Sequence, residues 1–194
     1  MKDIRYANRG RSFEEFLRYA NGWYEREGIA MVEKIPTEFI PLRDNRGKIY
    51  SVKVEHKSTV DYIGRYKQYP LAMEAKNTNT DTIRWDAVQP HQAEFLDKFT
   101  LQPGTIGLVL VSFNLETFYT IPWAFWGAAY DLRVRRDDRT TRVRISAFGE
   151  EWYIPTKKSV RMEDLNPTWQ VSTRNHGFYG FDYLQNAEKY VIKL

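Results

Sequence analysis

Cysteine is absent from this 194-residue sequence, and so are long apolar runs. The lack of cysteine excludes disulfides and thiolate zinc sites. No apolar run approaches the ~20 residues that a membrane-spanning helix requires. The first residues, Met1 to Tyr6, also lack the apolar segment and cleavage site of a secretory signal. We therefore expect a soluble protein of the cytoplasm that has no membrane partner.

The composition, with 42% hydrophobic and 28% charged residues, is typical of a globular protein. A chain of this length fits one domain, so we expect residues 1–194 to form a single unit. The net charge of +4 suits a polyanionic partner, although many ordinary proteins have a similar charge. Aromatic residues make up 15% of the chain, and we expect more of them in the core than on a surface that stacks bases.

A helix is predicted to begin after Ser12. Ser12 and Glu15 have the spacing of a capping box, in which each side chain satisfies a free backbone amide. Apolar residues then recur at helical spacing and define one buried face, formed by Phe13, Phe16, Leu17, Ala20 and Tyr24. At about 100° per residue, Glu14 lies at the border of this face and Glu15 almost opposite it. Glu14 is thus better placed than Glu15 to face a site, although a carboxylate in a first turn is favourable by itself.

The order of the other predicted elements indicates an α/β fold. Strands are predicted at 29–32, 61–64, 71–76 and 107–111, and a helix that begins at Pro90 precedes the last of them. A strand, a helix and a strand in this order imply a parallel right-handed crossover. Farther along the chain, 118–121 is predicted as a strand and 123–130 as a short helix.

Two basic segments are predicted to lie outside the core. Residues 42–57 surround a turn at Asp44 to Gly47, which predicts a projecting hairpin that we call the stalk. Its basic residues, Arg43, Arg46, Lys48, Lys53 and Lys57, fit repeated phosphate contacts, and a solvated hairpin without function is the alternative. Six arginines lie between Arg133 and Arg144, and they favour a second exposed hairpin.

Glu74, Lys76 and Asp61 form the set of residues best suited to chemistry. Side chains on a strand alternate between faces, so Glu74 and Lys76 share one surface. If Asp61 lies beside them, two carboxylates converge at a spacing suited to Mg²⁺, and Lys76 can stabilise charge on a phosphate. An exposed Glu–Lys ion pair is the alternative. The apolar residues before Glu74 and the helix after it place these charges at a strand's carboxyl end, where ligand sites occur.

Taken together, the motifs resemble those of RecU-type Holliday-junction resolvases, a branch of the PD-(D/E)xK nuclease superfamily. The matching blocks follow the family's order over most of the chain: Asn8-Arg9-Gly10, Phe13-Glu14-Glu15, Lys34 to Thr37, Ser58 to Tyr62 with Gly64, Tyr66-Lys67, Glu74-Ala75-Lys76, His91-Gln92 and Lys158 to Arg161. As a set they are far more specific than any one block.

This resemblance implies a restriction-endonuclease-like core, with a mixed central sheet flanked by helices and a projecting basic stalk. It implies a homodimer that uses Mg²⁺ or Mn²⁺, and no organic cofactor, to nick opposite strands of a four-way DNA junction. Asp61 and Glu74 would hold the metal, and Lys76 would be the catalytic lysine. Glu14 would lie near the metal, and Gln92 would be an auxiliary residue of the site. Nucleic-acid contacts would come from Arg9, Arg11, Tyr66 and Lys67 as well as from the stalk.

The sequence departs from the family at residue 60, where Val replaces a usual small polar residue, and in a slightly shorter stalk. The arginine-rich residues 132–152 resemble an insertion. The compact chain and divergent tail would suit a phage-encoded member. Two alternatives stay open: a nuclease of the same core that cuts other DNA, and a DNA-binding recombination protein without catalysis.

Overall fold

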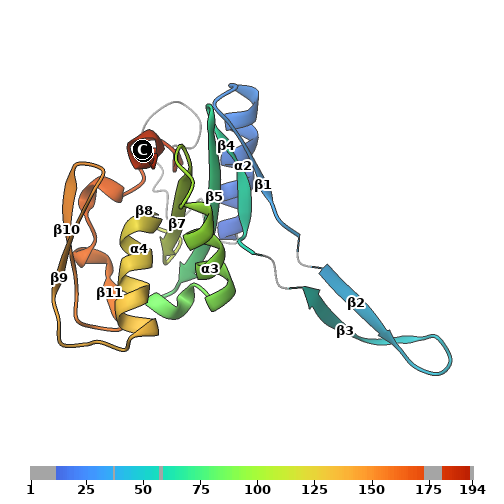
Figure 1. Cartoon of the computed structure of the whole chain (residues 1–194). Coiled ribbons are helices and arrows are strands. Elements are labelled where there is room, and N and C mark those ends of the chain that lie inside the picture. Colours follow the sequence, from blue (N-terminus) through green and yellow to red (C-terminus); the bar gives the residue numbers. More distant parts are fainter. Residues whose placement is uncertain (1–11, 37, 57–58, 173–180, 193–194) are drawn as a thin grey trace.

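A five-stranded sheet organises the computed structural model, which describes residues 12–36, 38–56, 59–172 and 181–192. The strand order is β1-β4-β5-β7-β8. The strands are β1 (Ala30–Lys34), β4 (Tyr62–Tyr66), β5 (Tyr69–Thr78), β7 (Ile106–Phe113) and β8 (Thr117–Pro122). Helix α2 (Phe13–Arg26) covers one face, and α3 (Pro90–Phe99) and α4 (Trp123–Tyr130) cover the other, as Figure 1 shows. The predicted mixed sheet flanked by helices is confirmed.

Helix α2 begins as predicted. The Ser12 amide donates to Glu15 Oε2 at 2.9 Å, and the Glu15 amide donates to Ser12 Oγ at 3.3 Å, which completes the capping box. Its buried residues are Phe13, Leu17, Ala20 and Tyr24, with Phe16 partly buried against the same core. The predicted apolar face is therefore confirmed.

The centre of the sheet contains the predicted crossover. Strand β4 pairs antiparallel with β5 through a tight turn, and β5 pairs parallel with β7 after α3. All eight residues of β7 are buried, as expected for a strand covered on both faces. Strand β1 approaches β4 closely at Gly64, where a Cβ atom would lie 2.0 Å from the backbone oxygen of Met31. Only glycine fits there, so this residue keeps the two strands in register.

The stalk is an antiparallel pair of β2 (Glu38–Arg43) and β3 (Ile49–His56) that projects from the body of the molecule (Figure 1). The predicted turn is present, because Asp44 Oδ1 accepts from the amides of Arg46 and Lys48. The stalk begins at Glu38, earlier than the predicted residue 42. Pro41 lies within β2, where proline is tolerated because each strand of an isolated pair has a free edge on which a missing amide costs nothing.

The arginine-rich segment is partly helical, which corrects the prediction of one exposed hairpin. A π-helical turn, Asp131–Arg135, continues α4, and a hairpin of β9 (Val143–Ala147) and β10 (Glu150–Ile154) follows. Arg133 is fully buried, and its guanidinium donates to the backbone carbonyls of Thr141 and Pro155, which lie just before and just after this hairpin. The other arginines of the segment are exposed.

Short elements complete the fold. Strand β6 (Thr82–Arg84) pairs with β11 (Ser159–Arg161), and 3-10 turns occupy Trp85–Ala87, Met162–Asp164, Pro167–Trp169 and Ala187–Tyr190. The C-terminal segment packs on α2, where Tyr24 donates to Asp182 at 2.7 Å and Tyr183 donates to Asn21 at 2.5 Å. Within the described ranges, every helix is too short or too polar to cross a membrane.

Candidate active site

The candidate site lies where β5 approaches its carboxyl end, beside the base of the stalk. Asp61 comes directly before β4, and the register pairs its neighbour Tyr62 with Met73 on β5. This antiparallel pairing brings Asp61 beside Glu74. The backbone oxygen of Asp61 also accepts from the Ile35 amide at 2.8 Å, so the residue is held at the point where the stalk leaves and rejoins the sheet.

Reciprocal hydrogen bonds fix Asp61 and Glu74 relative to each other. The Asp61 amide donates to Glu74 Oε2 at 3.1 Å, and the Ala75 amide donates to Asp61 Oδ2 at 3.1 Å. Each carboxylate thus has one oxygen bound to the backbone of the other strand. The predicted convergence of the two carboxylates is confirmed.

Glu74 is fully buried, and its second oxygen forms an ion pair with Lys76. Lys76 Nζ lies 2.5 Å from Oε1, but outside hydrogen-bond geometry, and no other donor among the described residues reaches this oxygen. Burial, followed by the negative charge of Asp61, raises the pKa of Glu74 to about 7, against the opposing effect of Lys76. A buried carboxylate beside a second one is a costly arrangement that a bound cation would relieve.

Gln92 connects Lys76 to the first turn of α3. Its Oε1 accepts from the Gln89 amide at 2.8 Å and from Lys76 Nζ at 3.4 Å. Gln92 is buried, so these two contacts restrict both its own side chain and the ammonium group of Lys76. The structure therefore brings Gln92 together with Glu74 and Lys76, as the sequence predicted.

Glu14 lies at the same end of the sheet but forms a different contact. Its Oε2 is 2.7 Å from Lys34 Nζ, and in the described part of the chain no contact joins it to Asp61 or Glu74. Glu14 and Tyr62 both line a groove of about 380 Å³ between α2 and β1. Burial, followed by the charges of Glu14 and Asp61, raises the pKa of Tyr62 to about 12. Sequence reasoning missed Tyr62, although its position directly after Asp61 could have marked it.

The donor set fits a hydrated divalent cation. Asp61 and Glu74 offer carboxylate oxygens, the ligands that Mg²⁺ and Mn²⁺ prefer, and one buried Glu74 oxygen has no aligned partner. No group of three or more acidic or histidine side chains converges among the residues that the structure describes. Two carboxylates are sufficient for Mg²⁺, which usually keeps several of its waters.

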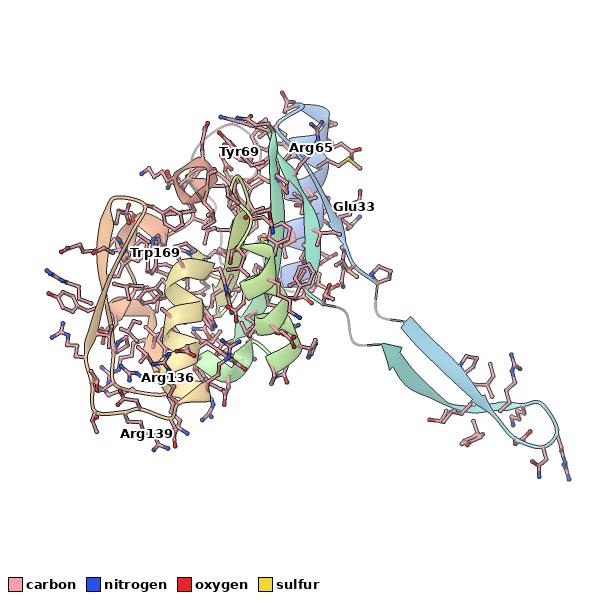
Figure 2. All side chains as sticks on the ribbon, viewed as in Figure 1. Glu33, Arg65, Tyr69, Arg136, Arg139 and Trp169 are labelled. Atoms are coloured by element: carbon pink, nitrogen blue, oxygen red, sulfur yellow. The ribbon has the colours of Figure 1, made fainter. Side chains whose placement is uncertain are left out.

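The predicted DNA-contact residues are divided between two ends of the molecule. Arg43, Arg46 and Lys48 are exposed on the stalk. Tyr66 is buried and Lys67 pairs with Glu188 at 2.6 Å. Tyr66 and Lys67 lie at the turn between β4 and β5. Figure 2 shows Arg65 and Tyr69, which flank this turn, at the end of the sheet away from the stalk. The structure thus does not bring Tyr66 and Lys67 to the site. Arg9, Arg11 and Lys57 lie outside the described residues, as does the side chain of Lys53.

Comparison of the sequence with known proteins identifies its family. Residues 8–174, which include every proposed catalytic residue, match the RecU family model, described as Recombination protein U. The chain belongs to the RecU family. The family resemblance predicted from the sequence is confirmed.

Two curated relatives are both named Holliday junction resolvase RecU. The protein of Streptococcus pneumoniae (strain Taiwan19F-14) is 32% identical over 133 residues, which cover 66% of this chain and 64% of the relative. The protein of Streptococcus mutans (strain ATCC 700610 / UA159) is 33% identical over 127 residues, 62% of this chain and 64% of the relative. The chain thus spans slightly less than two thirds of the length of these relatives.

Among solved structures, Archaeoglobus fulgidus Hjc, a Holliday junction resolvase, aligns with a TM-score of 0.38 and 12% identity. The alignment covers 58% of this RecU-family chain and 78% of Hjc.

Proposed function

We propose that this RecU-family protein is a metal-dependent endonuclease that resolves four-way DNA junctions by nicking opposite strands. The observation that supports it most is the Asp61–Glu74 pair, in which reciprocal backbone hydrogen bonds hold a fully buried carboxylate beside a second one. This pair stands at the base of a basic stalk, so a cation site and a DNA-contacting projection share one end of the molecule.

Asp61 and Glu74 would hold the cation, Mg²⁺ or Mn²⁺. When bound there, such an ion supplies polarisation of the scissile phosphate and lowers the pKa of an attacking water. Glu74 must be ionised to act as a ligand, and its raised pKa means that the ion competes with a proton for this carboxylate.

Lys76 would stabilise the negative charge that develops on the phosphoryl group during hydrolysis. Its ammonium group is held between Glu74 Oε1 and Gln92 Oε1, so its position is fixed before DNA arrives. Glu14 contributes negative charge across Tyr62 and would act at longer range than the two ligands. Gln92 is a positioning residue in this mechanism, because it acts through Lys76.

The stalk would hold the DNA. Arg43, Arg46 and Lys48 are exposed near its tip, where phosphate contacts can position a junction without reading its sequence. The stalk leaves the sheet after Lys34 and rejoins it before Asp61. DNA bound along the stalk is therefore guided toward the carboxylate pair.

Three further features belong to the proposal. Residues 1–194 act as a single nuclease domain, and two copies form a homodimer, because paired nicks on symmetry-related strands are most simply made by two identical sites. The protein acts in the bacterial cytoplasm, where its DNA substrate lies.

The test compares a mobile four-way junction, a linear duplex and a flapped duplex of equal length at one salt concentration, with Mg²⁺ and with Mn²⁺. We expect paired nicks in the junction by the parent protein. Asp61→Asn and Glu74→Gln should bind the junction as the parent does and should not cut it, whereas Glu116→Gln, at an exposed position, should cut normally. Equal cleavage of all three DNAs would instead indicate a general nuclease, and binding without cleavage with either metal would indicate a non-catalytic protein.

A further inference from the structure

A groove of about 800 Å³ lies on the arginine-rich side of the molecule, away from the stalk. One wall is the β9–β10 hairpin with the residues leading into it, and the other is formed by residues 155–167. Figure 1 shows this hairpin and the stalk at opposite edges of the molecule. None of the residues that line the groove belongs to the site described above.

The floor of the groove is a rigid aromatic cluster. Phe125 and Trp169 have ring centroids 4.8 Å apart, and Trp152 lies 5.2 Å from Trp169 and 6.0 Å from Phe125. All three residues are almost completely buried. Such a packed floor keeps the shape of the groove without a ligand.

Two cations on the rim of the groove have no acidic partner among the described residues. The Arg142 guanidinium lies 4.4 Å from the ring centre of Tyr153, which is 53% exposed, and Lys157 is exposed with no ion pair. Neighbouring arginines differ, because Arg144 pairs with Glu151 at 3.2 Å and Arg139 with Asp137 at 3.0 Å. The two cations without an acidic partner, Arg142 and Lys157, therefore both line the groove.

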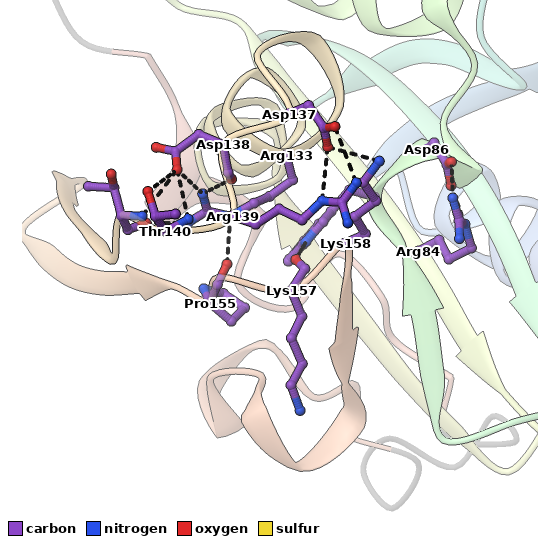
Figure 3. Close-up of polar contacts among 12 residues, drawn as sticks. Arg84, Asp86, Arg133, Asp137, Asp138, Arg139, Thr140, Pro155, Lys157 and Lys158 are labelled. Atoms are coloured by element: carbon purple, nitrogen blue, oxygen red, sulfur yellow. Dashed lines mark hydrogen bonds and ion pairs between the residues drawn. The ribbon is translucent and has the colours of Figure 1, made fainter.

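Buried Arg133 holds both sides of the rim in place. Its Nε donates to the Pro155 oxygen at 2.7 Å, as Figure 3 shows. One terminal nitrogen donates to the Thr141 oxygen at 2.6 Å. Its other terminal nitrogen donates to the Asp138 oxygen. Thr141 precedes Arg142, and Pro155 lies two residues before Lys157. Arg133 therefore ties together the two backbone segments that carry the rim cations, and this restraint is in place before a ligand binds.

The polar groups of the rim suit phosphate. Thr156 and Ser159 add hydroxyl groups beside the two cations, and such groups are common donors to DNA phosphates. Glu151 is occupied by Arg144, and Asp164 is the lining carboxylate that has no ion pair in the described part of the chain. The rim therefore presents a small excess of free positive charge.

We propose that this groove binds the sugar-phosphate backbone of one DNA arm, through Arg142 and Lys157. The inference rests on the proposed function in one respect, namely that the partner is DNA. The path of the chain supports the placement: β6, whose Thr82 lines the groove, begins four residues after the end of β5. An arm that passes the carboxylate pair and continues away from the stalk would meet the groove.

The experiment measures junction affinity over a series of salt concentrations, with arms of about 10 and about 30 base pairs, one and three helical turns. The variants are Arg142→Gln with Lys157→Gln, and the control is Arg136→Gln with Arg139→Gln, which removes equal charge from positions whose acidic partners lie outside the groove. With long arms, the first pair should reduce the slope of log affinity against log salt by about 0.9 for each DNA phosphate that the protein no longer neutralises. With short arms the slope of the first pair should stay at the parent value. The control should have the parent's slope with both arm lengths.

Asp164→Asn should change junction affinity in the opposite direction, because it removes a negative charge from the groove and should tighten binding to long arms. A misfolded protein would not bind more tightly, so this variant separates loss of a contact from loss of structure. Equal losses of affinity in the two double variants, or losses independent of arm length, would overturn the assignment to an arm-binding groove. Parent-like binding by the Arg142 and Lys157 variant would mean that the groove serves another partner, such as an acidic protein segment. Failure of the parent to bind or cut junctions would refute the proposed function instead.

Discussion

Removing the ionisable group at position 74 should change how the stability of the metal-free protein depends on pH. The pKa of Glu74 rises from 4.5 to about 7 on folding, first because the side chain is buried and then because Asp61 lies beside it. A pKa that is higher in the folded state means that the folded protein binds the proton more tightly. The stabilisation that comes from this tighter proton binding is fully present below about pH 4.5 and is lost as the pH rises through about 7.

The magnitude follows from the shift. One pKa unit corresponds to about 1.4 kcal/mol, so Glu74 should lower the unfolding free energy by about 3 kcal/mol between pH 4.5 and pH 8. For a chain of this size, that change corresponds to a decrease in Tm of roughly 6–12 °C. In Glu74→Gln this contribution should be absent.

The assay is thermal unfolding in a chelator from pH 5 to pH 8.5, plotted as the difference between the parent and Glu74→Gln. Other groups titrate in both proteins and cancel in the difference, and Glu116→Gln controls for removal of one exposed carboxylate. Added Mg²⁺ should stabilise the parent more at pH 8 than at pH 6, because it competes with the proton for Glu74. Parallel curves for the parent and Glu74→Gln would refute the assignment of a raised pKa to this residue.

Three other substitutions test neighbouring parts of the structure. In a urea titration, Glu15→Gln should lower the free energy of unfolding by less than about 1 kcal/mol, because glutamine can also complete a capping box, and it should leave the cleavage rate normal. Glu14→Gln should slow cleavage more; the reverse order would contradict the assigned helix face. Gln92→Leu should lower kcat without changing junction affinity, because it frees Lys76; a change in affinity alone would exclude a positioning role. Arg133→Met should lower the free energy of unfolding measured in urea by about 3 kcal/mol, since three backbone carbonyls lose their charged donor; a free energy like the parent's would show that these bonds contribute little.

Elements set by short-range signals could be predicted well from the sequence. The capping box joins residues three apart, the stalk turn joins Asp44 to residues two and four positions away, and α4 occupies the predicted residues 123–130. In each case the chemistry that stabilises the element lies within a few residues. The approach of Asp61 to Glu74 was also predictable, because alternation and antiparallel pairing fix which side chains meet.

Contacts between distant segments could not be predicted in this way. Arg133 looked exposed because it belongs to an arginine-rich run, yet its burial depends on carbonyls contributed by Pro155, Asp138 and Thr141. Asp138 and Thr141 lie five and eight residues after Arg133, but Pro155 lies 22 residues away, and no local pattern indicates that it meets Arg133. Likewise, the bond from Lys76 to Gln92 spans the crossover, so Gln92 was predicted from the family resemblance rather than from spacing. Asp61, Glu74, Lys76 and Gln92 meet as predicted, whereas their catalytic roles remain predictions.

The junction between the stalk and the sheet determines which perturbations can separate DNA binding from chemistry. Asp61 is held from the stalk side by the Ile35 amide, and from the sheet side by the Ala75 amide. Glu74, in contrast, belongs to a strand whose neighbours on both sides are part of the sheet. Ile35 and Asp61 lie on the connections that lead into and out of the stalk, so deleting β2 and β3 would change both connections and would disturb Asp61 together with DNA binding, while Glu74 stays in place. Substitutions at the exposed tip, at Arg43, Arg46 and Lys48, remove charge far along the hairpin from Asp61, so they can weaken junction binding while the metal site keeps its geometry.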